Sequence, residues 1–127
     1  MKKIITVTLL LAGMLLLAAS CKKDDKESCK PNSSSFTTTQ DMTVQYRAMQ
    51  SGDGTISSLT YYTSATDVDT VNNPQLPWSV TVDVNAGSNL MISAEGTARN
   101  GQVGVSFEAV GQGEYVLQGD TCVKSHK

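Results

Sequence analysis

Short runs of alternating apolar and polar residues follow one another along most of the chain. In 42–48, 80–84 and 103–109, every second residue is apolar. A period of two is typical of strands that bury one face. No window after residue 20 has helical periodicity, so the pattern predicts an all-β domain.

Turn signals separate these runs. Ser51–Gly54, Asn85–Ser88 and Gly111–Gly113 contain the glycines that tight turns favour, and Gly119-Asp120 predicts one more turn. A short edge strand is expected within Thr66–Asn72. Seven to nine short strands in about 90 residues predict a small immunoglobulin-like antiparallel β-sandwich.

Aromatic residues mark two of the expected strands. Trp78 follows a proline at the start of an alternating valine strand, where it is either a core anchor or part of an exposed ligand platform. Tyr61 is expected to share the inner face of its strand with Ser57 and Leu59. Tyr62 then faces outward, because consecutive side chains of a strand alternate.

Residues 1–20 have the three parts of a secretory signal. Lys2 and Lys3 precede an apolar run, and small residues end it at Ser20. A retained transmembrane helix is the alternative, although the 17 residues from Ile4 to Ser20 are at the short limit for crossing roughly 30 Å of hydrocarbon.

The signal ends at a cysteine. Leu17-Ala18-Ala19-Ser20-Cys21 resembles the lipobox of bacterial lipoproteins, although Ala18 stands where that motif prefers leucine. The resemblance implies that Cys21 takes a diacylglycerol and, after cleavage, an acyl group such as palmitate. Two or more acyl chains anchor a protein stably, whereas one does not.

Charged residues follow the cysteine directly. Cys21-Lys22-Lys23-Asp24-Asp25 resembles the tether of Gram-negative lipoproteins displayed on the outer leaflet of the outer membrane. On this resemblance Lys23, Asp24 and Asp25 form an export tether. A solvated linker on a periplasm-facing anchor is the alternative. Residues 21–35, which are polar and almost free of apolar side chains, are expected to be a flexible tether, and 36–127 the domain.

Charge and cysteine content limit the partners and the chemistry. Without residues 1–20 the chain has eight basic and twelve acidic residues, which disfavours nucleic acid. Cys29 and Cys122 form the even pair expected of a disulfide in an exported protein. The rival is a metal site in which His126 joins both cysteines, but structural zinc prefers four protein ligands.

Catalytic motifs are absent from the sequence. It contains no Gly-x-Ser-x-Gly, P-loop or His-Glu-x-x-His pattern, so neither a catalytic residue nor a cofactor is predicted. Asp67 and Asp69 are taken as solvent-facing residues of the edge strand. Asp69-Thr70-Val71 resembles a bacterial O-glycosylation acceptor, with Thr70 as the modified residue.

Several segments together resemble the soluble domain of MmpS-type small membrane proteins. These are "MTVQY", "SSLTYYT", "LPWSVTVDVNAGSNLMISAEG" and "GQVGVSFEAVGQG", within about residues 41–123. The resemblance implies an immunoglobulin-like fold and a role as an accessory to large RND-type lipid exporters. The chain departs from that family in having a lipobox where its members have a transmembrane helix.

Two functions follow as hypotheses. The first is a non-enzymatic outer-membrane lipoprotein that binds an envelope protein, with an RND-type transporter as the implied partner. The second is a surface module that binds glycan or lipid through aromatics near Trp78.

Overall fold

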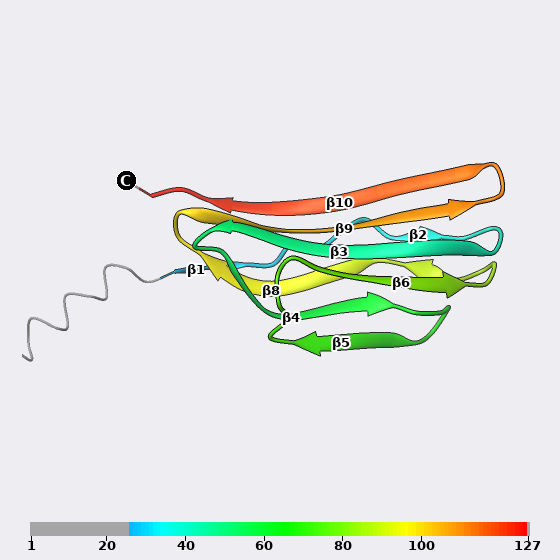
Figure 1. Ribbon diagram of the computed structural model, residues 1–127, viewed down its shortest axis with the longest axis horizontal. Helices are drawn as coiled ribbons and strands as arrows, with labels where there is room; N and C mark the ends of the chain where they lie inside the picture. Colours follow the sequence, from blue (N-terminus) through cyan, green and yellow to red (C-terminus); the bar gives the residue numbers. More distant parts are fainter. Residues whose placement is uncertain (1–25, 127) are drawn as a thin grey trace, which may run out of the picture.

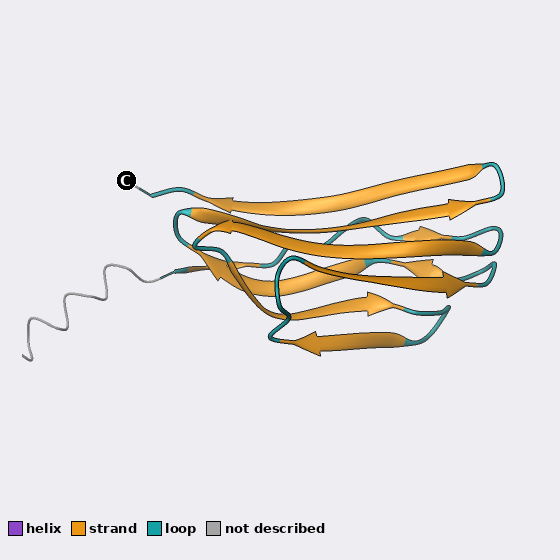
Figure 2. Cartoon of the chain, viewed as in Figure 1, coloured by secondary structure: helices purple, strands orange, loops and turns teal. Residues whose placement is uncertain are grey.

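The computed structural model describes residues 26–126, and these residues form strands and loops without a helix (Figure 2). Ten strands run along the long axis of the domain (Figure 1). They are β1 (Glu27–Cys29), β2 (Phe36–Thr37), β3 (Met42–Gly52), β4 (Thr55–Tyr62), β5 (Val68–Asn72), β6 (Trp78–Val84), β7 (Asn89–Leu90), β8 (Ile92–Ala98), β9 (Gly101–Gly111) and β10 (Glu114–Lys124).

The strands form two four-stranded antiparallel sheets that enclose one core. One sheet has the order β1-β8-β4-β5 and the other the order β10-β9-β3-β6, while β2 and β7 form a small two-stranded sheet. The predicted all-β sandwich is confirmed. It has ten strands rather than seven to nine, because β1, β2 and β7 are strands of two or three residues without an alternating pattern of their own.

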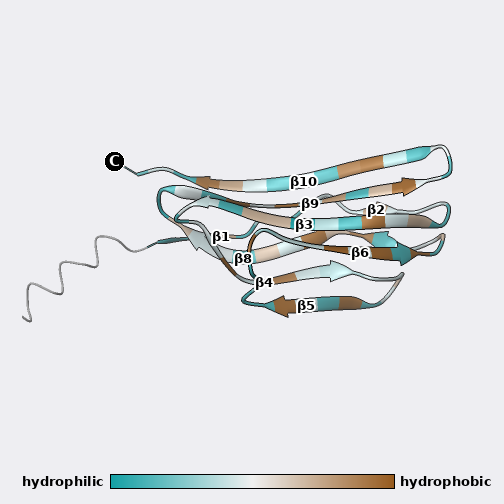
Figure 3. Cartoon of the chain, in the orientation of Figure 1, coloured by the Kyte–Doolittle hydropathy of each residue, from teal (hydrophilic) through white to brown (hydrophobic). Residues whose placement is uncertain are grey.

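The alternating runs predicted the core correctly. On β3 and β9 the apolar residues of each run face inward and are buried, and these two strands pair with each other from Thr43 to Gly52. Figure 3 shows the same alternation as bands of hydropathy along the strands. The buried apolar residues are Cys29, Met42, Val44, Tyr46, Ala48, Ile56, Leu59, Tyr61, Val84, Leu90, Ile92, Ala94, Ala98, Val103, Val105, Phe107 and Ala109.

The predicted inner face of β4 needs one correction. Its register against β8 shifts between Ile56 and Ser58, which marks a β-bulge. Because a bulge inserts one extra residue, it changes which residues face inward. Ile56 and Leu59 are therefore both buried, and Ser57 is exposed rather than aligned with Leu59 and Tyr61.

The turn predicted at Gly119-Asp120 does not exist. β10 continues through both residues and pairs with β9 over its whole length. A side chain at Gly119 would place its Cβ 3.0 Å from the Val105 carbonyl oxygen, so glycine serves close strand packing here. The error matters, because two short strands become one edge strand of eleven residues.

The domain also begins earlier than the predicted boundary at residue 36. β1 pairs with β8, and both Pro31 and Ser33 are buried. Ser33 accepts a hydrogen bond from the Ile92 backbone N–H through its side chain, 3.0 Å away. A polar composition suggested a linker, but hydrogen bonds to β8, which is distant in the sequence, hold this segment in place. Of the predicted tether, residues 26–35 therefore belong to the folded domain.

Candidate binding surface

The anchor and tether residues lie outside the described part of the chain. Cys21, Lys23, Asp24 and Asp25 all precede residue 26. The lipidation of Cys21 and the export role of the other three stay predictions.

The predicted disulfide is present between Cys29 and Cys122. Cys29 is the last residue of β1 and Cys122 lies on β10, so the bond joins the two sheets at the end where the chain enters the domain. Both sulfurs are engaged in this bond and are not available as thiolate ligands. Within residues 26–126, no three His, Cys, Asp or Glu side chains are arranged to hold a metal ion.

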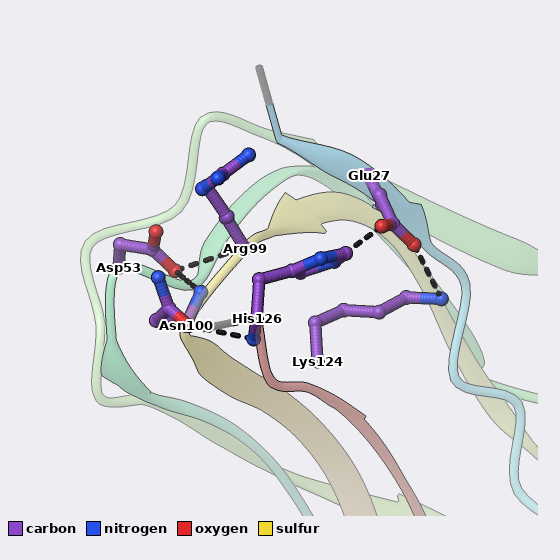
Figure 4. Close-up of polar contacts among 6 residues, drawn as sticks. All are labelled: Glu27, Asp53, Arg99, Asn100, Lys124 and His126. Carbon is purple, nitrogen blue, oxygen red and sulfur yellow. Dashed lines mark hydrogen bonds and ion pairs between the residues drawn. The ribbon is translucent and has the colours of Figure 1, made fainter. Parts of the chain in front are cut away.

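Charged side chains close the same end of the sandwich (Figure 4). Lys124 Nζ lies 3.3 Å from Glu27 Oε1, and His126 Nε2 contacts the other carboxylate oxygen. The hydrogen bond from Lys124, supported by His126, lowers the pKa of Glu27. The cluster therefore ties the end of β10 to the start of β1.

Asp53 holds the neighbouring turn. One of its carboxylate oxygens accepts hydrogen bonds from the backbone N–H groups of Arg99 at 2.9 Å and Asn100 at 3.0 Å. The hydrogen bond from the Arg99 backbone, and to a smaller extent that from Asn100, lowers the pKa of the Asp53 carboxyl. The Asn100 side chain in turn accepts from the His126 backbone N–H at 2.8 Å (Figure 4). These contacts hold this end of the domain together, so we assign them a structural role.

Trp78 lies against the core rather than standing clear of it. It is half-buried at the start of the edge strand β6, and its ring centroid is 5.4 Å from that of Tyr61. Tyr61 in turn contacts Tyr46, which contacts Phe107. Trp78 is thus the outermost member of an aromatic row that begins in the core.

Tyr62 is partly exposed, as its alternation with Tyr61 predicted. Its backbone carbonyl accepts a 2.7 Å hydrogen bond from the hydroxyl of Tyr46. Burial raises the pKa of Tyr46, so this hydroxyl stays protonated and acts as a donor. Trp78 contacts Tyr61 on the inner side of β4, whereas Tyr62 alternates to the outer side, so Tyr62 and Trp78 do not form one platform.

Thr70 is exposed on β5, and its hydroxyl lies 3.2 Å from that of Thr60. Glycosylation there stays a prediction. Asp69 is exposed as predicted, but it pairs with Tyr61 and so lies on the inner side of the strand. The Tyr61 hydroxyl is 3.4 Å from its carboxylate, at the open margin of the sandwich.

One outer surface stands out by its apolar side chains. Six large apolar side chains are exposed among the described residues, and all except Val68 lie on β3, β9 or β10. The registers place these five on the outer face of their sheet. We call them the apolar face: Met49 (52% exposed), Val110 (50%), Tyr115 (59%), Leu117 (57%) and Val123 (62%).

A polar network crosses this face. The Tyr115 hydroxyl donates to Glu108 at 2.6 Å, and Arg47 lies 3.6 Å from the same carboxylate group. Arg47 also donates to the Gln45 side chain at 2.5 Å. The bond to Glu108 raises the pKa of Tyr115. The network fixes the Tyr115 ring on the surface, since its hydroxyl has a defined partner.

A shallow hollow of about 310 Å³ lies in the middle of the face. It forms where Gly104 and Gly119 lack side chains, between Met49 and Thr121. The sequence predicted none of this surface. The mistaken turn at Gly119 divided β10, so its outward residues were not recognised as one row.

Comparison with known proteins supplies the family. The family model described as "Mycobacterium membrane protein" matches residues 4–110. The chain belongs to this family.

Membership in the Mycobacterium membrane protein family confirms the resemblance to MmpS-type proteins. The matched residues include the apolar run that follows Lys3 and extend to Val110 on β9. β10 lies beyond them, so family membership alone assigns no role to its surface. No curated protein and no solved structure matches the chain. Residues 26–126 contain no helix that could cross a membrane.

Proposed function

We propose that the protein is a non-enzymatic, lipid-anchored outer-membrane protein that binds a protein partner and assists envelope transport. The observation that carries this proposal is the concentration of exposed apolar side chains on one face of a family member. Apolar patches of this kind, rimmed by polar residues, are typical of interaction sites.

The residue types of the face support a protein partner. Protein interfaces are enriched in Tyr, Met and Arg, and Tyr and Arg are also frequent among the residues that contribute most to affinity. Tyr115 and Met49 are exposed here, and Arg47 lies beside them. The hollow in the face is open and shallow, unlike the enclosed pockets that bind small ligands.

A transporter of the RND type is the proposed partner, on the strength of the family. A lipid anchor instead of a transmembrane helix places this chain in the outer membrane, so the contact is made from that side of the envelope. The domain then acts as a connecting or adapting surface and performs no chemistry. An enzyme would instead need convergent acids, bases or nucleophiles.

The test places a photo-cross-linking amino acid on each outer face of the full chain in its host. Val110 lies on the apolar face and is 50% exposed. Val68, on β5 of the other sheet, is 46% exposed and is the matched control. Capture of an envelope transport component from Val110, but not from Val68, is the expected result.

Three results would contradict the proposal. Equal capture from both positions means non-specific contact. Capture of glycan or lipid alone supports the second function, and no capture at native levels means that the face has no partner. A Cys21→Ser variant tests the anchor separately, because loss of lipidation should release the protein from the membrane fraction.

The glycan- or lipid-binding alternative rests on a second hollow. It measures about 210 Å³ and is lined in part by Arg47, Pro77 and Trp78. An aromatic ring beside a guanidinium can stack on a sugar and donate hydrogen bonds to it, and Trp78 is partly exposed. Glycan binding that is lost in Trp78→Ala, with the apolar face unchanged, would favour this alternative.

A further inference from the structure

β10 presents a long free edge. It pairs with β9 on one side, and within residues 26–126 no other strand pairs with it. Its outward row contains Tyr115, Leu117 and Val123, each more than half exposed. The strand holds no proline, and its charged residues, Glu114, Asp120 and Lys124, lie on the inner row. The unpaired N–H and C=O groups of a long edge strand are a template for pairing with another strand.

The sequence of this edge complements itself. We infer that two copies of the chain pair through β10 in antiparallel fashion, with the two-fold axis at Gly119; this goes beyond the proposed function. In this register Glu114 at the start of each strand faces Lys124 at the end of the strand of the other copy. The facing residues of the two copies are Glu114 with Lys124, Tyr115 with Val123, Val116 with Cys122, Leu117 with Thr121, and Gln118 with Asp120.

Neighbouring registers lack this complementarity. A shift of two residues in one direction centres the pair on Asp120 and brings two carboxylates face to face. The opposite shift sets Glu114 against Cys122 and leaves Lys124 outside the strand pairing. Shifts of one residue would oppose inner with outer side chains, which strand pairing does not allow. Cross-strand opposite charges and apolar pairs both stabilise a sheet.

The central hollow fits the same register. Thr121 and Gly119 line it, and Thr121 is the residue that faces Leu117 of the second copy. That leucine would therefore enter the space left by Gly104 and Gly119. The exposed apolar side chain of each copy is covered by the hollow of the other, which is the reciprocity that a two-fold interface requires.

The arrangement also agrees with anchoring. A two-fold axis between antiparallel edge strands is perpendicular to the sheet, so the two chain entries lie at opposite ends of the pair. With both copies anchored in one membrane, the sheets lie along it. Confinement to a membrane raises the effective concentration of a weak pair.

The experiment uses full-length lipidated protein in host membranes, expressed as two differently tagged copies. One copy carries Leu117→Cys and the other Thr121→Cys, and a short bismaleimide links them. The matched control replaces Thr121→Cys with Thr70→Cys, an exposed threonine on the edge strand β5. A cross-linked pair carrying both tags is expected for 117 with 121, and none for 117 with 70.

Charge reversal tests the register. Glu114→Lys should weaken the pair roughly thirty-fold, because two contacts each change from about 0.5 kcal/mol of attraction to a similar repulsion, about 2 kcal/mol in all. Adding Lys124→Glu should restore pairing. Lys124 also contacts Glu27 within its own chain, so melting temperatures of all variants are compared to separate folding from pairing.

The proposal is overturned by any of three results. Correctly folded chains that give no 117–121 link contradict it. So does a charge-reversed double variant that pairs no better than Glu114→Lys alone. Cross-links from positions 117 and 121 to a different envelope protein mean that this edge is occupied by another chain. Capture from Val110 tests the proposed function independently, so either idea can fail alone.

Discussion

The two outer faces of the sandwich differ sharply in chemistry. On the β1-β8-β4-β5 sheet, hydroxyl groups pair with one another across strands: Thr55 with Thr97 at 2.8 Å, and Thr60 with Thr70 at 3.2 Å. On the β10-β9-β3-β6 sheet, the corresponding surface has the five side chains of the apolar face. Both sheets bury the same core, so folding alone does not account for the difference.

The free edges β5 and β10 differ in the same direction. β5 has five residues, and Asp69 lies on its inner side near the margin. A short strand offers few backbone groups for pairing with another chain. β10 also has inward charges, at Glu114, Asp120 and Lys124, but it is eleven residues long and its outward row is uncharged. We call the outer surface of the β1-β8-β4-β5 sheet, with its Thr55–Thr97 and Thr60–Thr70 pairs, the hydroxyl face. The contrast favours the apolar face and β10 as the surfaces that bind other chains.

The largest effect should come from the shared core. Phe107 lies beneath the apolar face and Leu59 beneath the hydroxyl face, and both are essentially inaccessible. Phe107→Ala should cost about 3–5 kcal/mol of unfolding free energy, and Leu59→Ala about 2–5 kcal/mol. Chemical denaturation measures both. A negligible effect at one of them would mean that the two faces do not share one cooperative core.

Loss of the disulfide should have the second largest effect on stability. Cys29 and Cys122 join the two sheets and are 93 residues apart. Reduction, or replacement of both by serine, should lower stability by about 2–5 kcal/mol, mostly through the freer unfolded chain. Thermal unfolding with and without reductant measures it, and neither thiol should be alkylated before reduction. A loss confined to the hydroxyl-face sheet would show that the sheets unfold separately.

Trp78→Ala sharpens the distinction between core and surface. The indole is half-buried and packs against Tyr61 at the margin, so its loss should cost less than that of Phe107, about 2–3 kcal/mol. Differential scanning calorimetry compares the two variants. An unchanged melting temperature would instead place Trp78 on the surface and favour the ligand-binding alternative.

How far the sequence predicts this molecule depends on the range of the interactions involved. Alternation correctly identified the inner residues of β3 and β9, because a strand's period is local. It failed at Gly119, where pairing with β9 overrides a local turn preference, and at Ser57, where a bulge shifts the phase.

The binding surface was harder to foresee than the core. Val110 and Tyr115 are opposite partners across a hairpin, but Met49 joins them only through the pairing of β3 with β9. Such a surface exists only once strand order is known. The disulfide was predictable, since two cysteines remained in an exported domain, whereas the place where it joins the sheets was not.

The smallest effect should be on folding stability at acidic pH. It arises from Glu27, at the end of the sandwich where β1 and β10 meet. Glu27 has a usual pKa of 4.5, which is lowered in the fold by Lys124 and His126. The unfolded chain therefore takes up this proton first as pH falls. The stabilisation is fully present above pH 4.5 and is lost as pH falls through the lowered pKa of the folded state.

Glu27→Gln should remove that part of the acid dependence. Melting temperatures measured between neutral and acidic pH should fall less in the variant than in wild type, while stability at neutral pH drops slightly because the pairs with Lys124 and His126 are lost. Asp53 keeps its lowered pKa in this variant, so it still contributes to the loss of stability at acidic pH. The outer faces should be unaffected, since the hydroxyl pairs do not titrate. An unchanged pH profile would mean that Glu27 pairs equally well in the unfolded chain.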